Sequence, residues 1–162
     1  MLTLYEAGNE AAWLASFSFF VDVRPRYCEC DGQGHLSNVA YPAYFELSRL
    51  QFFKAANDPE PYASFAFQHV TAELQLRYVA ACHYDEPLRV ASKLSTLGRS
   101  SAKMEQVVLG GDDSIRALAR VAIVRAGSGE RVTEPWSKAQ RVALEKFAGC
   151  VFAIAPPGLL ND

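Results

Sequence analysis

The order of hydrophobic and polar residues along the chain predicts five β-strands. In the first, residues 17–27, apolar side chains at odd positions alternate with mainly polar ones at even positions, which is the period of a strand with one buried face. The other four are expected at residues 69–78, 87–97, 102–109 and 115–125. Glycine-containing turns follow the last three strands. The short connections predict that these four strands are sequential antiparallel neighbours.

Three helices are expected around these strands. The segment from Pro42 to about Ala56 is apolar on nearly every side, which is typical of a helix that other elements surround. Proline suits the first turn of such a helix. A short helix at Glu10–Ala15 follows a potential Asn9 cap. An amphipathic helix at about Glu134–Phe147 is expected to bury its apolar residues, which are Trp136, Val142, Leu144 and Phe147.

This order of elements predicts an α+β fold in which one curved antiparallel sheet wraps around the first long helix. We expect a single domain over residues 1–162, with its core at about 17–147, a lead-in at 1–16 and a tail at 148–162. Such a sheet has free edges and leaves the helix partly uncovered. Pairing with a second copy would remove both liabilities, so we expect at least a homodimer.

Composition narrows the class of protein further. The chain has a formal net charge of -2, which offers no basic field for a nucleic acid. It contains no apolar run of the length that a bilayer requires, and its opening residues lack the positive region of a secretory signal. Four cysteines without a C-x-x-C pair indicate reduced thiols, so we expect a cytoplasmic protein.

The chemistry is expected where the first strand leads into the long helix. Asp31, Gly34, His35 and Asn38 lie in this turn, and the N-terminus of a helix presents N–H groups that can stabilise an oxyanion. A carboxylate at this place can attack a thioester or activate water. It can equally be a turn aspartate that makes local hydrogen bonds. The sequence has no G-x-S-x-G elbow, P-loop or metal-ligand spacing, so no metal or separate cofactor is expected.

The residues Asp31-x-x-Gly34-His35, followed by Asn38, Tyr41, Glu46 and Arg49, resemble the signature of the hotdog-fold acyl-CoA thioesterases of the 4-hydroxybenzoyl-CoA thioesterase type. The similarity continues through residues 70–90 and 97–102. It implies a hotdog fold, a dimer or dimer of dimers, and hydrolysis of an acyl-CoA or acyl-carrier-protein thioester, with CoA entering as part of the substrate.

The resemblance also suggests roles for individual residues. It implies that Asp31 is the catalytic carboxylate, that the backbone N–H of Asn38 lies in the oxyanion hole, and that His35 orients the substrate or Asp31. It places substrate contacts at six further residues, which are Gly34, Tyr41, Glu46, Arg99, Ser100 and Ser101. Some family members carry a histidine where this chain has Asn38, so the second catalytic group stays open.

Alternatives remain for several of these assignments. Glu46 can be a rival catalytic carboxylate, but Arg49 three residues later favours a structural ion pair. Gly34 can serve the turn alone, and Arg99 can be a solvated turn residue. A hotdog dehydratase or hydratase that uses His35 or His83, and a non-catalytic acyl-thioester binder, are the rival functions.

Overall fold

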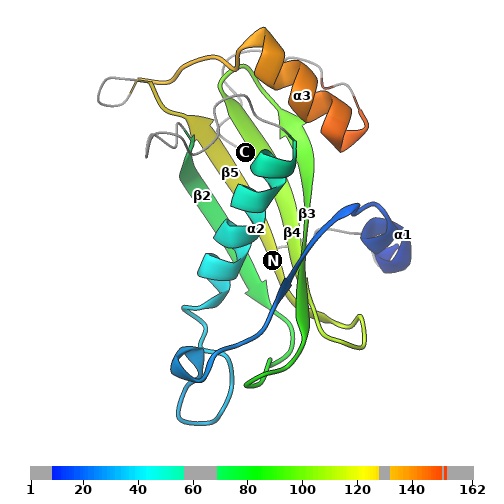
Figure 1. The fold of residues 1–162 in the computed structure, drawn as a ribbon, viewed down its shortest axis with the longest axis vertical. Coiled ribbons are helices and arrows are strands. Elements are labelled where there is room, and N and C mark those ends of the chain that lie inside the picture. The colour runs from blue at the N-terminus through cyan, green and yellow to red at the C-terminus, as the bar shows by residue number, and fades with distance from the viewer. Residues whose placement is uncertain (1–8, 57–68, 128–131, 151, 153–162) are drawn as a thin grey trace. The chain divides into compact units, whose positions relative to one another are not determined.

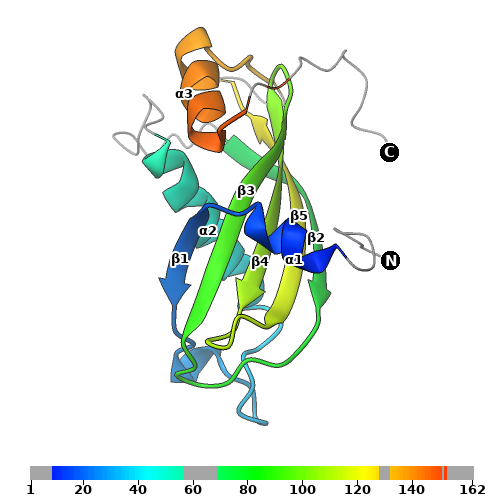
Figure 2. The same ribbon diagram turned by 90° about the vertical axis from the view of Figure 1, so that its right-hand side faces the viewer.

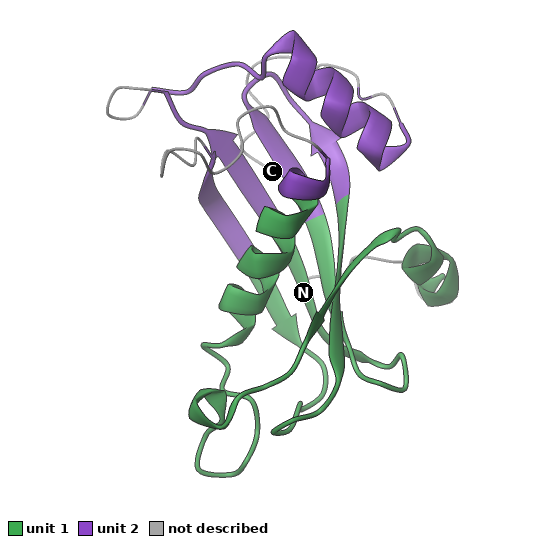
Figure 3. Ribbon diagram, in the orientation of Figure 1, with its two compact units in different colours: residues 1–52, 75–93, 105–120 green, residues 53–74, 94–104, 121–162 purple. Residues whose placement is uncertain are grey.

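The computed structural model describes residues 9–56, 69–127, 132–150 and 152. By contacts the chain divides into two compact units (Figure 3). Unit 1 comprises residues 1–52, 75–93 and 105–120, and unit 2 comprises residues 53–74, 94–104 and 121–162. Most of the predicted lead-in and tail lies outside the described residues, and the expectation of a single domain stays a prediction.

Five strands form one antiparallel sheet in the order β1-β3-β4-β5-β2 (Figures 1 and 2). Their bounds are β1 Phe19–Val23, β2 His69–Tyr78, β3 Leu88–Leu97, β4 Ser101–Leu109 and β5 Ile115–Arg125. The predicted neighbourhood of the second and third strands is wrong, because β2 lies beside β5 at one edge of the sheet. The segment between β2 and β3 is long enough to cross the end of the sheet, and β1 occupies the place next to β3.

Strand β1 is shorter than the sequence pattern suggests. It pairs with β3 from Phe19 opposite Ser92 to Val23 opposite Leu88, and it ends before Pro25, which cannot donate a hydrogen bond to a neighbouring strand. Within β1 the side chains alternate between partly buried and exposed positions. The predicted alternation is therefore confirmed over these five residues.

Helix α2, Tyr41–Ala55, packs on the sheet within unit 1 through both apolar and polar residues. Phe45 is fully buried, and the Ser48 hydroxyl lies 2.7 Å from that of Ser92 on β3. Arg49 is buried and donates to Gln106 Oε1 on β4 at 3.1 Å, and Gln106 donates to the Ser92 hydroxyl at 2.7 Å. The helix is thus held to the sheet by a satisfied buried polar network as well as by apolar contact. The prediction of a long helix is confirmed, but burial on nearly every side is not, because Ala43, Glu46 and Leu47 of α2 are exposed.

Helix α1, Glu10–Ala15, belongs to a second apolar cluster of unit 1. Its Trp13 packs edge-on against Phe17 at 4.8 Å and donates its indole N–H to Glu105 at 2.9 Å. The cluster also contains residues of β3, β4 and β5, which are Ala91, Val107, Leu109, Ile115 and Leu118. The Asn9 side chain makes no capping hydrogen bond, so α1 is held by the burial of Trp13.

In unit 2, helix α3 spans Lys138–Ala148 and begins later than the sequence suggests. Ser137 caps its N-terminus by accepting from Gln140 N at 3.1 Å, and Gly149 ends it in the left-handed conformation. Leu144 is buried as predicted, but Val142 is 56% exposed and Trp136 precedes the helix. The predicted apolar face was therefore wrong for Val142. No helix in the described ranges is long and apolar enough to cross a membrane.

Candidate functional site: a turn at the start of helix α2

Asp31 organises the turn that leads toward helix α2 in unit 1. Its Oδ1 accepts hydrogen bonds from the backbone N–H groups of Gln33 at 2.8 Å and His35 at 3.1 Å. The main chain closes the same loop, because Asp31 N donates to His35 O at 2.8 Å. One carboxylate oxygen is therefore fixed by the turn, while Asp31 as a whole is exposed. Among the residues that the structure describes, no hydrogen-bond partner is found for Oδ2.

Gly34 is required by the conformation of this turn. Its φ is +78°, in the left-handed region that favours glycine. No atom lies within 4 Å of the position that a Cβ would take, so the space around Gly34 is open. The geometry accounts for glycine at this position without a contact to substrate.

Two histidines meet beside the turn. His35 and His83 form an isolated β-bridge, and their rings lie edge to face with centroids 5.1 Å apart. His83 Nδ1 is 3.8 Å from Glu86 Oε2, and Glu86 accepts from Arg116 at 2.8 Å. In the described part of the chain, no group of three His, Cys, Asp or Glu side chains could hold a metal ion.

Glu29 ties the segment before the turn to helix α2. Its carboxylate accepts from Arg26 at 2.6 Å and from the Tyr44 hydroxyl at 2.6 Å. These hydrogen bonds lower the pKa of Glu29 to about 2, and the bond from Arg26 has the largest effect. The Glu29 carbonyl accepts from Ser37 N at 2.8 Å, so this clamp also anchors the residue that precedes Asn38.

The start of α2 presents unpaired backbone donors. Ser37 O accepts from Ala40 N at 2.9 Å, and Ala40 O accepts from Ala43 N and Tyr44 N. Within the described residues, the N–H groups of Asn38, Val39 and Tyr41 have no hydrogen-bond partner. Asn38 and Val39 are exposed, so their donors are available to a ligand.

Two tyrosines pack next to these donors. Tyr78, at the end of β2, donates its hydroxyl to the Asn38 carbonyl at 2.8 Å, and its ring meets that of Tyr41 at 5.1 Å. Tyr41 is only 3% exposed. Burial and a hydrogen bond with the Cys82 thiol raise the pKa of its hydroxyl. Tyr41 is therefore a wall residue whose hydroxyl faces Cys82.

The predicted catalytic residues line one cavity of about 420 Å³ in unit 1. Its walls come from the Asp31 turn, the start of α2 and the end of β2, and they include Asp31, His35, Leu36, Asn38, Tyr41 and Tyr78. The structure thus brings Asp31, His35 and Asn38 together at one opening, as the turn in the sequence predicts.

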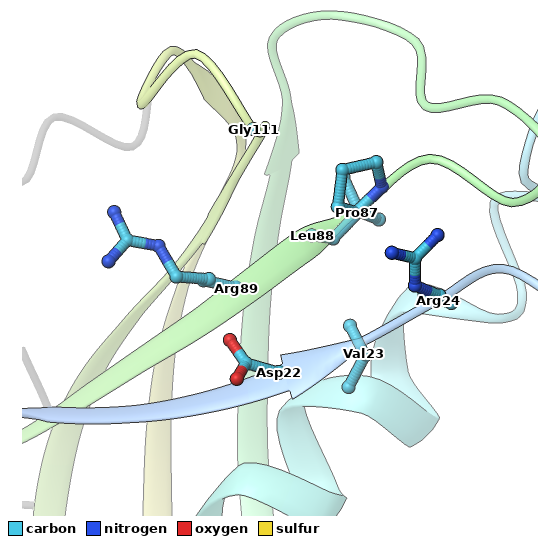
Figure 4. Close-up of a pocket in the computed structure, with 7 residues that line it drawn as sticks. All are labelled: Asp22, Val23, Arg24, Pro87, Leu88, Arg89 and Gly111. Atoms are coloured by element: carbon cyan, nitrogen blue, oxygen red, sulfur yellow. The ribbon is translucent and has the colours of Figure 1, made fainter.

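A larger cavity of about 620 Å³ lies between β1, the start of β3 and the β4–β5 turn (Figure 4). Arg24 and Arg89 line it together with Asp22, but both cations have acidic partners. Arg24 lies 3.4 Å from Asp85 and Arg89 pairs with Asp113. Its charges are therefore largely balanced, and none of the residues predicted for chemistry lines it.

Other predicted residues lie away from the smaller cavity's lining. Glu46 is exposed on α2, while burial lowers the pKa of Arg49 and the Glu46 charge partly offsets this effect. Arg99 and Ser100 lie in the turn between β3 and β4 in unit 2, and Ser101 is the first residue of β4. Their carbonyls accept from Trp136 N, Arg125 N and Trp136 Nε1, respectively, so the backbone of this turn has a structural role.

Sequence reasoning missed Glu29 and Tyr78. Both act through contacts between segments far apart in the chain, and the alternation in β2 gives no sign that Tyr78 turns toward Asn38. The sequence did contain one signal that the Asn38 carbonyl needs a donor from elsewhere in the fold. Pro42 lies four residues after Asn38 and has no N–H to donate.

The model of the thioesterase superfamily matches residues 33–117, which are 85 of the 162 residues. The chain belongs to the thioesterase superfamily. YsmA of Bacillus subtilis (strain 168) is 37% identical over 89 residues, which are 55% of this chain and 59% of that protein. The chain therefore spans about three fifths of the length of this curated relative.

Solved thioesterase structures share the fold. A thioesterase from Thermus thermophilus, complexed with coenzyme A and Zn, is 25% identical with a TM-score of 0.74 over 83% of this chain and 96% of that one. A predicted thioesterase from Bacillus stearothermophilus is 25% identical with a TM-score of 0.72, over 86% of this chain and 98% of that one. A thioesterase superfamily protein from Jannaschia sp. CCS1 has a TM-score of 0.76 at 23% identity, over 91% and 94%. The expected hotdog fold is confirmed.

Proposed function

We propose that this protein hydrolyses acyl-CoA thioesters, with Asp31 as nucleophile or general base. The observation that carries the proposal is that Asp31 lines the same cavity as Asn38 and Tyr41, which lie before and at the start of α2 and whose backbone N–H groups are unpaired among the described residues. Membership of the thioesterase superfamily supports the reaction class. The similar Thermus thermophilus thioesterase that is complexed with coenzyme A supports the leaving group.

The turn gives each group its part in this mechanism. With Oδ1 held by two backbone N–H groups, Oδ2 is the oxygen that can attack the thioester carbonyl or take a proton from water. The N–H of Asn38 stabilises the oxyanion that develops on the carbonyl oxygen. The C–S bond then breaks and CoA leaves as a thiolate that takes up a proton. When Asp31 acts as a base, water attacks the thioester and supplies the second oxygen of the free acid; when Asp31 acts as a nucleophile, water cleaves the Asp31–acyl anhydride that has formed, which releases the acid and regenerates the carboxylate.

Thiol release from a panel of acyl-CoA esters tests the proposal. Wild type should release thiol, and Asp31→Asn should lower kcat by roughly a hundredfold or more, because the amide is neither a base nor a nucleophile. Asp22→Asn, in the larger cavity, is the matched control and should retain wild-type turnover. Unchanged hydrolysis by Asp31→Asn would remove Asp31 from the mechanism. Saturable binding of CoA esters without thiol release by wild type would favour a non-catalytic binder.

We also propose that the protein works as a homo-oligomer paired through β2. This strand is an edge of the sheet, and Val70, Tyr78 and Val79 are each close to half exposed. An edge strand with apolar exposure is a template for pairing with another copy. Size-exclusion chromatography with light scattering should give a mass of at least twice the 17.8 kDa of the chain. A monomeric mass would contradict the proposal.

A further inference from the structure

The carbonyl oxygen of Asn38 lies in the turn before helix α2 and is an acceptor that the helix does not satisfy. In a continuing helix, this oxygen would accept from the N–H of the residue four positions later. That residue is Pro42, which has no N–H. Buried or partly covered carbonyls are normally paired, so the sequence leaves a place here for a donor from elsewhere in the fold.

Tyr78 supplies that donor from the end of β2. Its hydroxyl donates to Asn38 O at 2.8 Å across 40 positions of sequence. The aromatic ring of Tyr41 braces that of Tyr78, with centroids 5.1 Å apart and the planes at 75°. Because Tyr41 is itself buried, the Tyr78 ring rests on a fixed support.

This bond completes the fixation of Asn38. The peptide plane before Asn38 is set by the bond from Ala40 N to Ser37 O at 2.9 Å. The plane after Asn38 carries the carbonyl that Tyr78 holds. A peptide unit is planar, and in the trans form its C=O and N–H point in opposite directions. The bond to Ser37 O therefore fixes the direction of the Asn38 N–H, and the bond to Asn38 O fixes the direction of the Val39 N–H.

We propose that Tyr78 is a positioning residue for thioester hydrolysis, whose hydroxyl holds the Asn38–Val39 peptide unit and so aims the Val39 N–H, next to that of Asn38, at the thioester oxygen. The inference rests on the proposed function. Preorganised donors stabilise charge that develops in the transition state and bind the ground state less. A hydrogen bond to the carbonyl of a peptide also polarises its N–H and makes it a better donor.

A rescue experiment separates positioning from direct contact with substrate. Tyr78→Phe removes the hydroxyl and keeps the ring. We expect kcat to fall roughly tenfold with KM nearly unchanged, which is a smaller loss of kcat than the removal of an oxyanion donor itself would cause. Pro42→Ala supplies an N–H four residues after Asn38, which can donate to Asn38 O if the helix extends back over the turn at residues 38–40. The double variant Tyr78→Phe with Pro42→Ala should therefore recover most of the lost kcat. Pro42→Ala alone should stay within about twofold of wild type.

Tyr84→Phe is the matched control for loss of a tyrosine hydroxyl. Tyr84 is 58% exposed and its ring contacts Tyr27. The kcat of the Tyr84→Phe variant should therefore equal that of wild type. Thermal unfolding and light scattering verify that Tyr78→Phe stays folded and keeps its oligomeric mass.

The possible failures are distinct. If wild type releases no thiol, the proposed function and this inference fall together. If wild type hydrolyses thioesters and Tyr78→Phe does so equally well, only the positioning role falls. It also falls if Tyr78→Phe loses kcat and Pro42→Ala restores none of it, because a hydrogen bond to Asn38 O then does not account for the loss.

Discussion

Asp31 and Asp112 occupy closely similar turns in unit 1, and the comparison shows which features of its surroundings set apart the aspartate that we propose as catalytic. Asp31 Oδ1 accepts from the N–H two residues on, at 2.8 Å. Asp112 Oδ1 does the same with Ser114 N at 3.1 Å and also accepts from the Ser114 hydroxyl at 2.6 Å. Both side chains are exposed. Local turn chemistry therefore does not distinguish the two aspartates.

Their surroundings differ. Asp112 lies 3.6 Å from the guanidinium of Arg116, four residues later, and bonds from Ser114 lower the pKa of its carboxyl. Asp31 has His35 at the corresponding position, and among the described residues no cation pairs with it. Asp31 also shares a cavity with the unpaired donors of a helix start. A carboxylate without a paired cation, in the same cavity as such donors, suits the role that we propose for Asp31.

The largest expected difference comes from lengthening both side chains. Asp31→Glu keeps the charge but moves the carboxylate by one methylene, and a misplacement of roughly 1 Å costs about a hundredfold in kcat. Asp112→Glu should remain within about twofold of wild type in turnover. Both variants should lose similar amounts of stability, because each gives up its turn hydrogen bonds. Steady-state thiol release and thermal unfolding test this pair, and equal turnover by the two variants would contradict it.

A second experiment makes the Asp31 turn resemble the Asp112 turn. His35→Arg places a guanidinium four residues after Asp31, as Arg116 follows Asp112. An adjacent cation favours the ionised carboxylate and weakens it as a base and nucleophile. We expect kcat to fall roughly tenfold and the acid limb of the pH–rate profile to move to lower pH. His35→Gln, which adds no charge, serves as the control and should leave that limb in place. An unshifted limb in His35→Arg would mean that residue 35 does not face Asp31 during turnover.

The Glu29 clamp before the turn should show its own pH dependence. The pKa of Glu29 is lowered in the fold from 4.5 to about 2. Its contribution to stability is therefore complete above pH 4.5 and is lost as the pH falls toward 2. Glu29→Gln should cost about 1–2 kcal/mol of unfolding free energy at pH 7. Denaturant unfolding across this pH range should show the two proteins converging in acid, and a difference that persists at pH 2 would argue against the clamp.

The site also shows how far sequence reasoning reaches. The Asp31 turn and the helix after it follow from local rules, because polar turn residues and an apolar run signal both. The neighbour of β2 does not follow from local rules. Either β1 or β2 could pair with β3, and which of them does so depends on the packing of the whole sheet. Arg49 shows the same limit. Its spacing favours a pair with Glu46, but helix packing also brings it to Gln106 of β4, a residue that no helical spacing identifies.

The smallest expected effect concerns the two glycines of the Asp31 turn, which the space around them does not distinguish. Neither Gly32 nor Gly34 has an atom within 4 Å of the position that an added Cβ would take, yet Gly34 alone of the pair has a positive φ, at +78°. Gly34→Ala should therefore cost about 1 kcal/mol through backbone strain. Gly32→Ala should be neutral or slightly stabilising, because alanine restricts the unfolded chain. Unfolding free energies measure both, and equal costs would show that the turn relaxes to accept a side chain. If the turn holds its shape, Gly34→Ala should lose less activity than Asp31→Glu, since the carboxylate keeps its length and Gly34 is not among the residues that line the cavity.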